Sequence, residues 1–193
     1  MAITIYEDTL QKNYDGDDKH AEKHFWWAAH GIEVVRTRFD GKHGVPVSFG
    51  DYYYEGSNVV VDTKRDLYEL MGNLGAGYRR IDHECARAHE SGYRLVFLVE
   101  SGEEYAEPSA LATVRSRYCF KCSHGFRKRC NPTNPKSGCA KRGDRKKPFQ
   151  GYQMAGKMKI LSDKYGTVFA FCEPSESARD ICDLLGVVLD GCE

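Results

Sequence analysis

The sequence lacks any run of 18 consecutive apolar residues, which excludes an ordinary membrane-spanning helix. It also lacks, near its first residue, the basic segment and apolar core of a secretory signal, so we expect a cytoplasmic protein. Net charge is absent too, with 28 basic and 28 acidic residues. Hydrophobic residues make up 41% and aromatic residues 12%, which excludes a disordered chain. A length of 193 residues suits one domain, 1–193, that carries an insertion.

The zero net charge hides a strong local imbalance. Residues 115–148 contain twelve lysines or arginines and one acid, so the rest of the chain is acidic. Such asymmetry is typical of a polyanion-binding arm, and it favours nucleic acid over the alternative of a solvated basic loop. The candidate nucleic-acid-binding residues of this segment are Arg127, Lys128, Arg129, Lys141, Arg142, Arg145, Lys146 and Lys147.

The same segment contains a cysteine cluster. Cys119 and Cys122 form a Cys-x-x-Cys pair, and Cys130 and Cys139 follow among glycines and prolines. Zn²⁺ takes four thiolate or imidazole ligands, and a segment with so few apolar residues needs such a metal to become ordered. We therefore predict a structural zinc loop at 115–148 that binds DNA phosphates without recognising the base sequence. His124 is an alternative ligand, a disordered basic insertion is the alternative structure, and disulfides do not suit a cytosolic chain.

The stretch 46–67 predicts the central feature of the chain, a β-hairpin. Residues 47–54 and 58–64 have strand character, and the turn between them contains Gly56 and Asn58, which tolerate positive φ. The second strand has a continuous β-branched run, which indicates burial on both faces. Asp62 and Lys64 alternate onto one face of this strand, and Asp51 lies near the end of the other.

Two carboxylates and an ammonium that meet at a sheet edge suit a divalent cation and a scissile phosphate. Mg²⁺ prefers oxygen ligands and is usually held by one or two carboxylates plus substrate phosphate. A lysine on the same strand face can orient the attacking water or neutralise charge on phosphorus. The alternative is a turn flanked by polar residues, with Lys64 reaching solvent along its stem.

Periodicity along the rest of the chain predicts an α/β fold with a central mixed sheet flanked by helices. Before the hairpin we expect a short strand at Ile3 and Ile5, a helix at 19–30 and the first strand of the main sheet at 32–39. After the hairpin we expect helices at 67–74, 78–88, 154–164 and 175–185, the last capped by Ser175, and buried strands at 93–99 and 167–172. Cys85, Cys172 and Cys182 have the apolar neighbours of small core residues.

The two motifs Gly50-Asp51-Tyr52 and Val61-Asp62-Thr63-Lys64 resemble the nuclease domain of the XPF family, structure-specific DNA endonucleases of the PD-(D/E)xK superfamily. The resemblance covers about 31–102 and resumes at about 151–186. It implies a restriction-endonuclease-like fold. Two positions depart from the family pattern. Asp62-Thr63 stands where the family usually has Glu-Arg, and Tyr68 holds the place of a downstream acid, with Asp66 and Glu69 nearby.

The resemblance implies roles for individual residues. Asp51 and Asp62 would hold Mg²⁺ or Mn²⁺, the Thr63 carbonyl could add a ligand, and Lys64 would assist the water. The remaining candidates from the resemblance are Arg79 or Arg80 as phosphate contacts, Glu22 as a first-helix acid, and Gln150 or Gln153 near the metal.

The implied activity is hydrolysis of branched or flapped DNA in repair or recombination, with a possible homodimer and a nucleoid or nuclear location. The alternatives are a catalytically inactive nucleic-acid-binding module and a zinc-stabilised adaptor. His20 and His24 sit one helical turn apart, as metal ligands can, but the sequence shows no third ligand near them.

Overall fold

The computed structural model describes residues 3–10, 20–42, 44–119 and 148–189. Their main feature is a six-stranded sheet in the order β2-β1-β3-β4-β5-β8. In this sheet β3 runs antiparallel to both of its neighbours, and the other neighbouring pairs are parallel. The strands are β1 (Ile3–Asp8), β2 (Ile32–Thr37), β3 (Tyr52–Tyr54), β4 (Val59–Lys64), β5 (Arg94–Glu100) and β8 (Val168–Cys172). The mixed sheet that the sequence predicts is confirmed.

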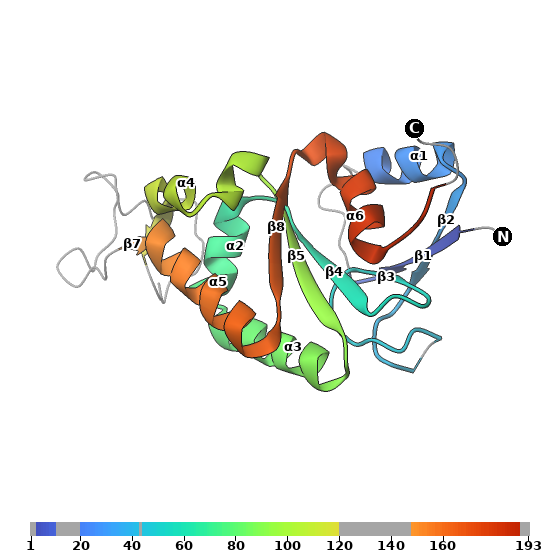
Figure 1. Ribbon diagram of the computed structural model, residues 1–193, viewed down its shortest axis with the longest axis horizontal. Coiled ribbons are helices and arrows are strands. Elements are labelled where there is room, and N and C mark those ends of the chain that lie inside the picture. Colours follow the sequence, from blue (N-terminus) through green and yellow to red (C-terminus); the bar gives the residue numbers. More distant parts are fainter. Residues whose placement is uncertain (1–2, 11–19, 43, 120–147, 190–193) are drawn as a thin grey trace.

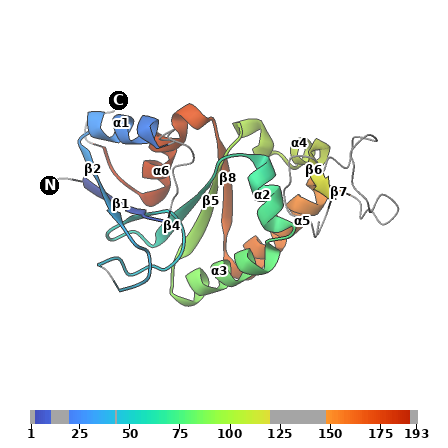
Figure 2. The ribbon, with the colours of Figure 1, turned by 180° about the vertical axis from the view of Figure 1, so that it is seen from behind.

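Helices cover both faces of the sheet. Figures 1 and 2 show α1 and α6 together on one face, and α2, α3 and α5 on the other. The helices are α1 (Ala21–Ala29), α2 (Leu67–Leu74), α3 (Tyr78–Glu90), α4 (Pro108–Thr113), α5 (Gly151–Tyr165) and α6 (Ser177–Leu185), with short 3-10 turns η1 (Glu103–Ala106) and η2 (Pro174–Glu176). This arrangement confirms the α/β class.

Strand β4 shows why the two faces carry separate cores. Val60 and Val61 are both fully buried, and they point to opposite faces because side chains alternate along a strand. Val60 packs in the core beneath α2, α3 and α5. Val61 packs in the core beneath α1 and α6, where the Trp27 indole also donates a hydrogen bond of 3.0 Å to the carbonyl of Ala178. The predicted burial of this strand on both faces is confirmed.

The topology gathers strand ends at one edge. Strands β4 and β5 are parallel and are joined through α2 and α3, so their carboxyl ends lie side by side. Strand β1 runs in the same direction, since β3 is antiparallel to both β1 and β4. Polar residues at the ends of β1, β4 and β5 therefore meet at one edge, which is where ligands bind in open α/β sheets.

Three expectations about element boundaries are wrong. The strand at residues 32–37 is not the first of the main sheet, because β1 precedes it and lies between β2 and β3. Val47 and Phe49 are buried but lie in a bent segment, which turns at Gly50 (φ +73°) before β3 begins at Tyr52. Ser175 does not cap α6, because it lies in η2 and the helix begins two residues later.

A second, two-stranded sheet pairs β6 (Arg115–Cys119) with β7 (Pro148–Gln150) in antiparallel fashion. These two strands flank residues 120–147 in the sequence. The predicted zinc ligands Cys122, His124, Cys130 and Cys139 lie outside the described residues, as do Arg127, Lys128, Arg129, Lys141, Arg142, Arg145, Lys146 and Lys147. Among the described helices, none combines the length and the apolar character needed to cross a bilayer.

Candidate active site

Asp62 and Lys64 lie on the face of β4 that α2 and α3 cover. Each residue is only 5% exposed. The Lys64 ammonium contacts the Asp62 carboxylate, lies 3.4 Å from the Thr63 carbonyl oxygen and sits 5.2 Å from the ring centre of Phe97. The alternative in which Lys64 reaches solvent is thus excluded, and the structure brings the predicted pair together.

Asp51 precedes β3 and joins two strands across the edge. Its N–H donates to the carbonyl of Val61 at 2.8 Å, and its own carbonyl accepts from the N–H of Asp8 at 2.9 Å. Its carboxylate accepts from Thr63 twice, from the backbone N–H at 2.7 Å and from the hydroxyl at 2.9 Å. Gly50 lies just before Asp51 with φ +73°, a conformation that favours glycine. These bonds hold the Asp51 carboxylate at the end of β4.

The electrostatics of Lys64 connect these groups. Burial lowers its pKa by penalising the charged ammonium, while the negative charges of Asp51, Glu69 and Glu84 act to raise it. The ammonium is therefore buried among carboxylates whose charges partly offset the cost of its desolvation. Perturbed, desolvated groups of this kind concentrate at functional sites.

Glu84 on α3 also belongs to this site, although it is not among the candidates from the sequence. It is 8% exposed, and one carboxylate oxygen accepts from the N–H of Gly50 at 3.4 Å. The other oxygen accepts from Arg80 at 3.1 Å, and Arg80 also donates to Asn73 at 2.6 Å. The sequence contains a signal for the burial of Glu84, because this residue lies in the apolar stripe of Ile81, Cys85 and Ala88.

The downstream acids have structural roles at the start of α2. Asp66 caps the helix by accepting from the N–H of Glu69 at 2.7 Å. Glu69 in turn accepts from the N–H of Arg65 at 3.1 Å. Tyr68, which holds the place of the family's acid, is 39% exposed. Glu69 remains close enough for its charge to act on Lys64.

The other candidates lie on, or at the start of, the helices that flank the sheet. Arg79 is an exposed residue of α3, and Glu22 is an exposed residue of α1. Gln150 and Gln153 form a reciprocal capping box at the start of α5, with the Gln150 N–H donating to Gln153 at 2.9 Å. Both side chains thus have a hydrogen-bonding role at the start of α5.

His20 and His24 do have an acidic neighbour, contrary to the sequence-based expectation. Glu7 at the end of β1 is fully buried, with one carboxylate oxygen 2.9 Å from the His24 imidazole and the other 3.9 Å from that of His20. Arg36 lies 3.5 Å from the same carboxylate. Glu7 follows Ile3 and Ile5 on the same face of β1, and this alternation was the sequence signal for its burial. Across the described residues, no three histidine, cysteine or acidic side chains are grouped so as to hold a metal ion.

This geometry defines the chain as an α/β protein with an acidic, lysine-bearing site at the carboxyl edge of a mixed sheet. No protein-family model matches the sequence, and no curated protein matches it. Among solved structures, XPF from Aeropyrum pernix in complex with DNA is similar, with a TM-score of 0.51 and 13% identity. The match covers 96% of this chain and 64% of the XPF chain, so this chain spans less than two thirds of the length of that protein. At this identity the likeness shows the fold.

Proposed function

We propose that the chain is a metal-dependent DNA endonuclease that hydrolyses phosphodiester bonds. The observation that carries this proposal is the buried contact between Lys64 and Asp62, with the charges of Asp51 and Glu84 close to the same ammonium. A protein that needed only a stable core would gain little from such a group, since desolvating charges is costly. The likeness in fold to XPF supports the same class of activity.

The donor set fits Mg²⁺ or Mn²⁺. The carboxylates of Asp51 and Asp62 and the carbonyl of Thr63 are hard oxygen donors, and one or two carboxylates are enough when water and substrate phosphate complete the shell. The Lys64 ammonium contacts Asp62 and lies near the Thr63 carbonyl, so a cation already lies against two of these oxygen donors. When bound, the ion would polarise the phosphoryl oxygen and acidify a water molecule.

The side chains divide the remaining tasks. Lys64 orients the attacking water and neutralises charge that develops on phosphorus. Thr63 fixes the Asp51 carboxylate through two hydrogen bonds, so that this group needs little reorganisation. Glu84 supports the Gly50 N–H and thereby the backbone that presents Asp51. Arg80, whose side chain is 60% exposed, and Arg79 would contact the phosphates of the DNA strand.

Cleavage of labelled branched and linear DNA, with Mg²⁺ or with EDTA, tests the proposal. We expect cleavage only with the metal, and a loss of about 100-fold or more in Asp62→Asn and Lys64→Ala. Asp163→Asn is the matched control, because Asp163 is an exposed acid of α5 that pairs with Lys159. Wild-type activity in Asp62→Asn and Lys64→Ala would refute the assignment of these two residues to the active site. Faster cleavage of branched or flapped substrates would support that substrate class.

A DNA-binding module without cleavage activity is the second candidate. It is favoured by the two departures from the family pattern, Asp62 in place of glutamate and Tyr68 in place of a downstream acid. Retained DNA affinity without cleavage under any divalent metal would establish it.

The zinc loop remains a separate proposal, supported by the spacing of Cys119, Cys122, Cys130 and Cys139. Metal analysis of the purified protein should find one zinc ion per chain. Its absence from a reduced, folded protein would refute the loop. A homodimer is proposed on the resemblance alone, and the mass of the protein in solution tests it.

A further inference from the structure

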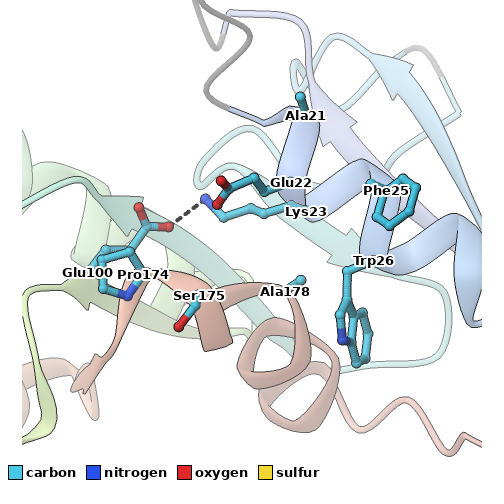
Figure 3. A pocket seen from close by; sticks show the side chains of 9 residues that line it. All are labelled: Ala21, Glu22, Lys23, Phe25, Trp26, Glu100, Pro174, Ser175 and Ala178. Atoms are coloured by element: carbon cyan, nitrogen blue, oxygen red, sulfur yellow. Dashed lines mark ion pairs between the residues drawn. The ribbon is translucent and has the colours of Figure 1, made fainter.

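A cavity of about 430 Å³ opens on the other face of the sheet, between α1, the end of β5 and the start of α6. Figure 3 shows Glu22 and Lys23 pointing across it toward Glu100, with Ser175 along one wall and Trp26 extending past Ala178. The cavity is within the usual size range for small-ligand sites. The nuclease proposal assigns it no task.

The polar lining of the cavity is acidic. Lys23 is 7% exposed and lies 2.5 Å from the Glu100 carboxylate, which also accepts from the Ser177 hydroxyl at 2.7 Å. The charge of Lys23 is therefore matched by Glu100, and Glu22 adds a further negative charge. Carboxylate oxygens accept hydrogen bonds and repel anions, so this lining suits a group with N–H donors and disfavours phosphate.

Aromatic side chains supply the apolar part of the lining. Trp26 lines the cavity, and His30 stacks on it with ring centres 3.8 Å apart, which holds the indole in one orientation. Phe25 also lines the cavity and is 79% exposed, so its ring is available to a ligand. Exposed aromatic rings beside hydrogen-bond acceptors are the combination that proteins use to bind unstacked nucleobases.

The cavity is next to the candidate active site. Lys64 pairs in register with Val99, and Glu100 follows directly, so the two sites open at adjacent strand ends. Tyr52 of β3 is fully buried. Burial raises the pKa of its phenol, and the charges of Glu7, Asp51 and Glu100 raise it further, so the hydroxyl is within electrostatic reach of both sites.

We propose that this cavity binds one unstacked nucleobase of the DNA strand close to the scissile phosphate, which rests on the proposed nuclease function. The base stacks against Trp26 and Phe25, and its amino or imino groups donate to Glu22 and Glu100. Bases that carry an exocyclic amino group are preferred over thymine. The scissile phosphate lies on the Lys64 side of the edge, and the base reaches the α1 side.

Fluorescence of a short single strand that carries one 2-aminopurine, in Ca²⁺ to prevent cleavage, tests this proposal directly. Binding to the wild-type protein should quench the probe. Trp26→Ala should weaken binding about tenfold, as loss of a base–aromatic stack does, and Trp26→Phe should restore most of the affinity. Phe25→Ala, at an exposed position that cannot disturb the core, should weaken binding about fivefold. Ile160→Ala, an exposed apolar position on α5, is the matched control and should change nothing.

The same strand with an abasic residue in place of 2-aminopurine separates base recognition from phosphate binding. Equal wild-type affinity for both strands, or unchanged affinity in Phe25→Ala and Trp26→Ala, would overturn the base site even if the protein cleaves DNA. If quenching depends on Trp26 but the protein never cleaves DNA, the result would support the base site and refute the nuclease proposal.

Discussion

Glu84 offers a sharp test, because its carboxylate supports Gly50 and Arg80 from within a largely buried position. Glu84→Ala removes the acceptor for the Gly50 N–H, which costs about 1–3 kcal/mol of unfolding free energy when a buried donor loses its partner. The ion pair with Arg80 adds little, at most about 1 kcal/mol, because that side chain is 60% exposed. Glu84→Gln keeps an acceptor and should cost less than about 1 kcal/mol.

The effect on activity should be of similar size to the effect on stability when both are expressed as free energies. Residues that orient metal ligands typically change affinity or rate by about 10- to 100-fold, and we expect Glu84→Ala to fall in that range. Cleavage rates measured across a Mg²⁺ titration, alongside urea unfolding, give both quantities. Glu90→Ala, at the exposed end of the same helix, is the control. A folded Glu84→Ala protein with a wild-type rate at every Mg²⁺ concentration would refute the reasoning.

Two further predictions concern the scaffold. In Gly50→Ala, the new methyl group would meet the Val60 side chain and lie 3.2 Å from the Val61 carbonyl at φ +73°, so urea unfolding should show a loss of about 2–4 kcal/mol. Gly56→Ala, with φ +86° and no atom within 4 Å, should lose only about 1 kcal/mol, and equal losses would contradict the packing argument. Burial raises the pKa of the Cys85 and Cys182 thiols to about 11 and that of Cys172 to about 12, so mass spectrometry should find all three unalkylated in native protein at pH 8 and alkylated in denaturant. Native alkylation of Cys172 at the rate of an exposed thiol would contradict its burial.

Local patterns explain which parts of the fold could be predicted. The β-branched run of β4 and the 3.6-residue period of α2 and α3 are strong signals, and all three elements were found near their expected bounds. The place of β1 inside the sheet depends on pairing between distant segments, which no local pattern encodes. Val47 and Phe49 have strand propensity, but the segment that contains them is bent because the chain turns at Gly50.

The candidate site shows the same division. Asp62 and Lys64 are two residues apart on one strand, so alternation alone placed them on one face. Placing Asp51 near this pair required the register of the hairpin, and the turn residues Gly56 and Asn58 indicated that register. Glu84 and Glu7 are distant in sequence and reach their sites only through tertiary packing. Both, however, interrupt an apolar stripe, which is a usable signal for a buried functional acid.

The single-turnover cleavage rate of Lys64→Ala relative to the wild-type protein, on labelled DNA in saturating Mg²⁺, tests the central claim most directly. If the buried ammonium beside Asp62 assists the attacking water, the rate should fall about 100-fold or more while the protein stays folded and bound to DNA. A rate within about threefold of the wild type would show that hydrolysis, if present, occurs elsewhere.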